Sequence, residues 1–108
     1  MSDVTLRWMG TDDVEAVVAA SGLLDGPARP DWTQRFLDEP GHHLCLAYDE
    51  AGRPVGFVSG VETTHPDKGT EMFLYELAVA EDARRRGVGR SLVDALSARA
   101  QELGCYAM

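Results

Sequence analysis

The sequence predicts a single α/β (or α+β) domain with the element order β-α-α-β-β-β-α-β. Three observations support this fold class. The chain has 108 residues, a length that suits one domain with a modest core. Short runs typical of strands alternate with segments whose apolar residues recur at helical spacing. Late in the chain, an apolar strand runs into a loop rich in glycine and arginine, and a long amphipathic segment follows.

The first elements are a strand and two helices. Residues 4–8 alternate apolar and polar side chains, which predicts a half-buried strand. Thr11 or Asp12 is expected to cap a helix that ends at Gly22. A second short helix is predicted over 30–38, ahead of a Pro-Gly stop. The apolar faces comprise Val14, Val17 and Val18 in the first helix, and Trp32, Phe36 and Leu37 in the second.

Three strands are predicted next. Residues 43–48 and 54–61 are rich in apolar side chains and are joined by a turn over 49–52, as in a hairpin. Residues 63–69 are expected to form a polar loop. A third strand over 70–79 completes the set.

The main helix is predicted over 91–103, because its leucines and alanines recur at helical spacing and Gly104 follows as a C-terminal cap. Residues 105–108 are expected to begin a further strand. By the right-handed crossover rule it should run parallel to the strand before the helix.

The loop before the main helix has what an anion site needs. A helix start leaves backbone N–H groups without intrahelical partners and carries partial positive charge. Gly87 and Gly89 have no Cβ, so an anion can approach the main chain closely. The loop therefore predicts a binding site for a phosphate or pyrophosphate. Full positive charges come from Arg84, Arg85, Arg86 and Arg90.

This loop resembles the signature of the GNAT superfamily of acetyl-CoA-dependent N-acetyltransferases. Arg84-x-x-Gly87-x-Gly89 fits the pattern Arg/Gln-x-x-Gly-x-Gly/Ala, and residues 75–79 read like that family's fourth strand. The resemblance implies a GNAT-like mixed, centrally antiparallel sheet, with coenzyme A pyrophosphate held by loop residues 84–90, Val88 included. Residues 71–79 with the loop look most like the aminoglycoside 3-N-acetyltransferases.

Acetyl transfer to an amine needs a group that removes the amine proton and donors that polarise the thioester carbonyl. Glu76 is the first candidate base, because it lies beside the strand amides, and Glu71 is the second. Tyr75 is expected in the core. The resemblance implies that a bulge frees the amides of Leu77, Ala78 and Val79 to face the thioester.

The charge is unevenly distributed. The formal net charge is −8, yet the residues from Arg84 onward carry a positive excess. The acidic remainder argues against nucleic acid as a partner. It suits a small cationic amine, although a surface that merely keeps the protein soluble explains it equally well.

Several alternatives stay open. The acceptor is an aminoglycoside at its 3-N position, or else a protein N-terminus, a polyamine or another small amine. A non-catalytic, vestigial CoA-binding domain is the other class. GNAT domains continue past the start of a fifth strand, so the resemblance implies that the C-terminal part of the family domain is absent here. Open sheet edges then favour association, such as a homodimer.

The remaining polar residues predict little further chemistry. His42 and His43 have no carboxylate or cysteine at ligand spacing, so we expect a strand-end pair and no metal site. Cys45 and Cys105 are expected as buried thiols of a cytoplasmic protein. The N-terminus shows no secretory signal, and no apolar stretch reaches membrane-spanning length.

Overall fold

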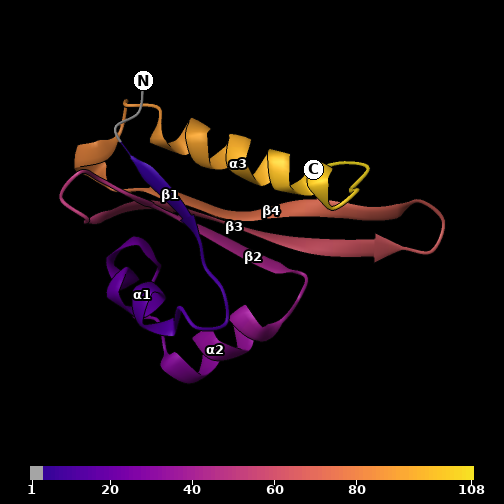
Figure 1. Ribbon diagram of the computed structural model, residues 1–108, viewed down its shortest axis with the longest axis horizontal. Helices are drawn as coiled ribbons and strands as arrows, with labels where there is room; N and C mark the ends of the chain where they lie inside the picture. Colours follow the sequence, from indigo (N-terminus) through magenta and orange to yellow (C-terminus); the bar gives the residue numbers. More distant parts are fainter. Residues whose placement is uncertain (1–3) are drawn as a thin grey trace.

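A computed structural model describes residues 4–108 as one twisted sheet with helices on both faces (Figure 1). Four strands lie in the order β1-β2-β3-β4, and every neighbouring pair is antiparallel. Helix α3 covers one face, while α1 and α2 lie on the other. The strands are β1 (Thr5–Trp8), β2 (His42–Tyr48), β3 (Pro54–His65) and β4 (Gly69–Val79). The helices are α1 (Val14–Ala19), α2 (Pro30–Asp38) and α3 (Val88–Glu102), with short 3-10 turns η1 (Ser21–Leu23) and η2 (Glu81–Ala83).

The two faces of the sheet carry separate cores. Because successive side chains of a strand point to opposite faces, the central strands need apolar residues at nearly every position. Cys45 and Val58 pack with Leu92 and Leu96 under α3. On the other face, Leu44, Leu46 and Phe57 pack with Val17 of α1.

Glycines on β3 let α3 come close to the sheet. A Cβ on Gly60 would lie 2.8 Å from Cδ1 of Leu96 and 2.9 Å from Sδ of Met72. At Gly56 it would lie 3.1 Å from side-chain atoms of Leu92 and Val88. The close packing fixes α3, and therefore the loop that precedes it, against the sheet.

Several sequence predictions need correction at the element ends. The main helix begins at Val88, three residues earlier than predicted, because Gly87 already closes the preceding loop in a left-handed conformation. Most of the predicted loop 63–69 belongs to strands, and only residues 66–68 form the turn. The N-cap of the first helix is Asp13, not Thr11 or Asp12, and its side chain makes no hydrogen bond to the helix. Its Oδ2 instead accepts a hydrogen bond from the preceding Gly10 amide at 2.7 Å.

The expected strand over 105–108 is reduced to a single parallel bridge between Glu71 and Ala107. The Tyr106 amide donates to the Thr70 carbonyl, and the Met72 amide donates to the Ala107 carbonyl, both at 2.9 Å. The predicted direction is right, but the described residues reach β4 only at this one point.

Strand β4 carries a bulge at Tyr75. Glu76 pairs with Ser59 and Leu74 pairs with Gly60, so Tyr75 is an extra residue in the ladder. The prediction that Tyr75 lies in the core is wrong, since the residue is 66% exposed. A bulge shifts the strand's hydrogen-bonding alternation by one, and this shift sets the direction of the amides that follow.

Candidate functional site

The loop before α3 ends in an uncapped helix start. Gly87 has φ 79° and serves as the N-cap of α3, and the Ser91 amide donates to the Gly87 carbonyl at 3.0 Å. Within residues 4–108, no side chain caps this end. The amides of Val88, Gly89 and Arg90 therefore lack intrahelical partners. A Cβ on Gly87 would meet no atom within 4 Å, which leaves room beside these amides.

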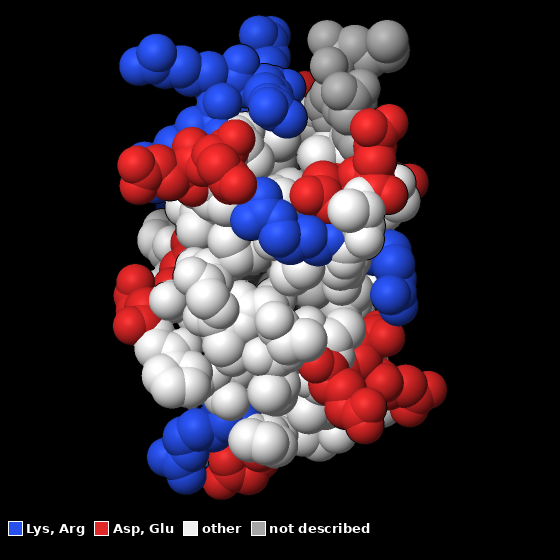
Figure 2. All heavy atoms as spheres, turned by 90° about the vertical axis from the view of Figure 1, so that its left-hand side faces the viewer, with Lys and Arg blue, Asp and Glu red and all other residues white. Residues whose placement is uncertain are grey.

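The arginines surround this helix start without converging on one point. Arg84 donates from Nε to the Val79 carbonyl at 3.2 Å, while Arg85 lies in the left-handed region at φ 67°. Arg86 lines a pocket behind the loop, and Arg90 is exposed on the first turn of α3. Figure 2 shows the basic side chains gathered at the top of that face, above a band of mixed charge. The cluster gives this end of the molecule a positive field for an anion.

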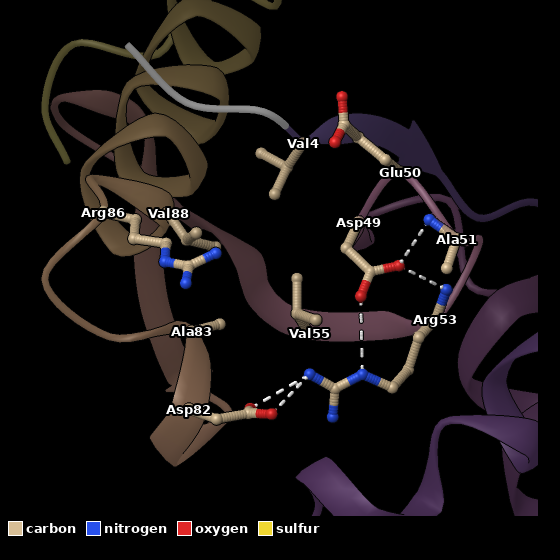
Figure 3. A pocket seen from close by; sticks show the side chains of 10 residues that line it. All are labelled: Val4, Asp49, Glu50, Ala51, Arg53, Val55, Asp82, Ala83, Arg86 and Val88. Atoms are coloured by element: carbon tan, nitrogen blue, oxygen red, sulfur yellow. Dashed lines mark hydrogen bonds and ion pairs between the residues drawn. The ribbon is translucent and has the colours of Figure 1, made fainter.

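Arg53 forms ion pairs with Asp49 and Asp82 at the start of the loop (Figure 3), a cluster called the clamp below. Arg53 donates from Nη2 to both carboxylate oxygens of Asp82, at 2.8 and 3.0 Å, and lies 3.4 Å from Asp49 through Nε. Asp49 in turn accepts the amides of Ala51 and Arg53 in the β2–β3 turn. The clamp borders a pocket of about 330 Å³ behind the loop. It joins η2 to the β2–β3 turn, a link between distant segments that the sequence did not reveal.

The free edge of β4 presents two amides next to the loop. The Ala80 amide donates to the Val55 carbonyl of β3 at 2.8 Å. Because alternate residues of a strand direct their amides to the same side, Ala78 also faces β3, whereas Leu77 and Val79 face the open edge. The bond from Arg84 to the Val79 carbonyl on that edge agrees with this direction. The bulge at Tyr75, which sets the direction of these amides, lies two residues before Leu77.

Glu76 lies in a pocket between β4 and the two N-terminal helices. The pocket has a volume of about 220 Å³, and its walls include Trp32, Phe36 and Phe57. Ser59, directly opposite Glu76 in the ladder, also lines it. Within the described chain, no side chain pairs with the Glu76 carboxylate. A carboxylate in such a position is able to accept a proton from a bound ligand.

Glu71 lies elsewhere. It is five residues before Glu76 on the same strand, which at the rise of a strand places it roughly 15 Å away. Its Oε2 accepts a hydrogen bond from the Tyr106 hydroxyl at 3.1 Å, and His65 Nε2 lies 3.6 Å from Oε1. The structure therefore joins Glu71 to the C-terminal segment and does not bring it to the pocket of Glu76.

Within residues 4–108, the histidines and cysteines lie outside the two pockets just described. His42 and His43 begin β2, as the expected strand-end pair. His43 is buried rather than on the surface, with Nε2 2.7 Å from Glu62 and Nδ1 3.4 Å from Arg99. No cluster of metal-ligating side chains occurs in the described part of the chain. Cys45 is buried, and burial raises the pKa of its thiol to about 11, whereas Cys105 is only half-buried. None of the described helices combines the length and apolar character needed to cross a bilayer.

Two curated acetyltransferases are similar to this chain in sequence. An L-2,4-diaminobutyric acid acetyltransferase of Chromohalobacter salexigens is 47% identical over 56 residues, covering 51% of this chain and 28% of the relative. The mycothiol acetyltransferase of Nocardia farcinica is 35% identical over 109 residues, covering 91% of this chain and 34% of the relative. The chain thus spans about a third or less of the curated relatives that it matches.

Solved structures share the fold. The aminoglycoside acetyltransferase meta-AAC0020 from an uncultured soil metagenomic sample, in complex with sisomicin, superposes with a TM-score of 0.85 at 17% identity. The match covers 97% of this chain and 74% of that structure. The family described as Acetyltransferase (GNAT) family, whose acetyltransferases use acetyl-CoA, matches residues 12–108. Because this match extends over most of the chain, the protein belongs to the GNAT family of acetyltransferases.

Proposed function

We propose that this protein transfers the acetyl group of acetyl-CoA to a primary amine. One observation carries the proposal. The strand that holds the unpaired carboxylate of Glu76 also turns two free amides to its open edge, and it ends beside the uncapped start of α3. One strand and its loop thus carry, in order, a proton acceptor, donors that can polarise a carbonyl and a binding site for an anion.

The residues fit acetyl-CoA. The amides at the start of α3, together with the arginines from Arg84 to Arg90, are suited to its pyrophosphate. The open space beside Gly87 admits the anion to the main chain. On the edge of β4, the outward amides of Leu77 and Val79 are suited to the acyl arm. The Ala78 amide faces β3 and therefore, contrary to expectation, does not face the thioester. Acetyl-CoA supplies an activated acyl group with a thiolate as leaving group.

The protein's part in the reaction follows from these positions. Glu76 takes a proton from the acceptor ammonium, which frees the nitrogen lone pair for attack. The edge amides stabilise the negative charge that develops on the carbonyl oxygen. A new C–N bond replaces the C–S bond, and the sulfur leaves as a thiolate with the bonding electron pair. The nitrogen then loses a second proton, which protonates the thiolate.

For the acceptor, the sequence suggests an aminoglycoside at its 3-N position, and a solved relative of the same fold is an aminoglycoside acetyltransferase in complex with sisomicin. The size and charge of the Glu76 pocket decide between this class and smaller amines. The matched diaminobutyric acid and mycothiol acetyltransferases support other amines as acceptors equally well.

The test is release of free coenzyme A from acetyl-CoA by the purified protein with a panel of amines, with mass detection of the N-acetyl product. Aminoglycosides, polyamines, simple alkylamines and peptide N-termini form the panel. Amine-dependent release with a matching product is expected. If calorimetry shows CoA binding and no amine is acetylated, the non-catalytic CoA-binding alternative holds instead.

A further inference from the structure

The lining and the volume of the Glu76 pocket indicate which carbon framework the acceptor amine carries. Its walls are apolar and come from several elements, with Leu24 before α2, Trp32 and Phe36 on α2, and Leu44 and Phe57 on the sheet. Its volume is about 220 Å³, whereas an apolar cavity of about 150 Å³ is enough to bind benzene. One ring or a short alkyl chain fills this volume, and a molecule of several sugar rings would extend beyond it.

The charges of the pocket favour an acceptor with a single buried charge. Glu76 contributes one negative charge, and no other carboxylate lines the pocket among the described residues. Arg29, the cation in the lining, is paired with Asp31 at 3.2 Å. A second ammonium inside the apolar walls would find no partner, and burying an unpaired charge is strongly unfavourable.

Ser59 supplies a polar group in the lining of the pocket. Its side chain is 3% exposed, and Oγ has no hydrogen-bond partner within the described chain. Buried hydroxyls are normally hydrogen-bonded, so an unpaired one that lines a pocket is suited to a bound polar atom. Ser59 lies directly opposite Glu76 in the β3–β4 ladder, where facing side chains are close neighbours.

From these three observations we propose that the acceptor is a primary monoamine on an apolar body. The body lies among the aromatic walls, Glu76 faces the ammonium, and Ser59 Oγ accepts a second N–H of the same nitrogen. Ser59 is thus a positioning residue that orients the nitrogen lone pair, while Glu76 removes the proton. The inference rests on the proposed function for the reaction itself, but the preference for the apolar amine is a property of binding and is measured separately.

The experiment compares two amines of equal chain length, pentylamine and 1,5-diaminopentane, which differ by one terminal ammonium. Calorimetry on the protein saturated with coenzyme A measures binding, and coenzyme A release from acetyl-CoA measures turnover. We expect pentylamine to bind about tenfold more tightly or better, because the diamine places a second charge against the apolar walls. Equal or tighter binding of the diamine or of sisomicin, or no binding of pentylamine, overturns the inference.

Two variants locate the bound amine. Trp32 is 56% exposed, so Trp32→Ala leaves the core intact and is expected to weaken pentylamine by about tenfold. Ser59→Ala should weaken it by about fivefold to tenfold, with coenzyme A affinity unchanged. Leu103→Ala, at an exposed position after α3, is the matched control and should change neither. If Trp32→Ala and Leu103→Ala bind pentylamine alike, the amine lies elsewhere and the inference fails. Selective binding without turnover counts against the proposed reaction alone.

Discussion

Replacing Gly87 by valine is expected to weaken coenzyme A binding, because the main chain at the start of α3 holds the pyrophosphate. Gly87 has φ 79°, a conformation that a β-branched residue adopts only with strain. No atom lies within 4 Å of the Cβ position, so the side chain fits the free protein but occupies the space through which an anion reaches the amides. The substitution therefore acts on the anion seat more than on the fold.

The magnitude follows from the hydrogen bonds at risk. A hydrogen bond to a charged group contributes about 1.5–3 kcal/mol, so losing one raises the Kd of coenzyme A by about 10- to 150-fold. Removing one exposed charge in Arg85→Ala should cost less than about 1 kcal/mol. Gly104→Val is the matched control, because Gly104 has φ 80° and equally open surroundings at the other end of α3. It carries the same backbone strain away from the anion seat.

Isothermal calorimetry with coenzyme A, accompanied by thermal melts, separates binding from folding. We expect Gly87→Val to lose affinity while Gly104→Val loses only stability. If Arg85→Ala weakens binding as much as Gly87→Val does, or if the two valine variants bind alike, the main chain is not what holds the anion.

Two further predictions concern stability and reactivity. Gly60→Ala should destabilise the fold by about 1–3 kcal/mol in urea denaturation, because its Cβ would lie 2.8 Å from Leu96. Gly26→Ala should not, since no atom lies within 4 Å of its Cβ position, and equal urea midpoints for the two variants would refute the packing argument. Iodoacetamide should modify Cys105 well before the buried Cys45, and modification of Cys45 at the rate of an unfolded thiol at pH 8 would contradict this. The free energy of unfolding should fall as pH rises from about 9 to 11, because the pKa of the Cys45 thiol is near 9.0 in the unfolded chain and about 11 when buried.

The sequence predicted the element order and the position of the loop well, because both depend on local patterns. Apolar periodicity marked the strands and the main helix, and the two glycines marked the turn before it. The end of the β3–β4 hairpin was missed because its residues are polar, although strand pairing satisfies their backbone. Thr64 and Thr70 even bond across it through their hydroxyls at 2.8 Å.

The parts of the site that depend on tertiary contacts could not be predicted. Nothing local distinguishes Ser59 from a solvent-facing strand serine, and its place opposite Glu76 depends on the bulge at Tyr75. Glu71 and Glu76 look equivalent in sequence and lie on the same face of the sheet, but the C-terminal segment contacts Glu71 whereas Glu76 lines the pocket beside α2. The clamp of Arg53 on Asp82 joins residues 29 positions apart, beyond the reach of any motif.

The most direct test of the account is the turnover of Glu76→Gln with the best amine acceptor. Glutamine keeps the size and removes the proton acceptor, so kcat should fall by about 10²–10⁴-fold while the Kd of coenzyme A stays the same. Glu71→Gln, made on the same strand but at the contact with Tyr106, is the comparison and should retain most of the activity. Unchanged kcat in Glu76→Gln, or an equal loss in both variants, would contradict the assignment of Glu76 as the base.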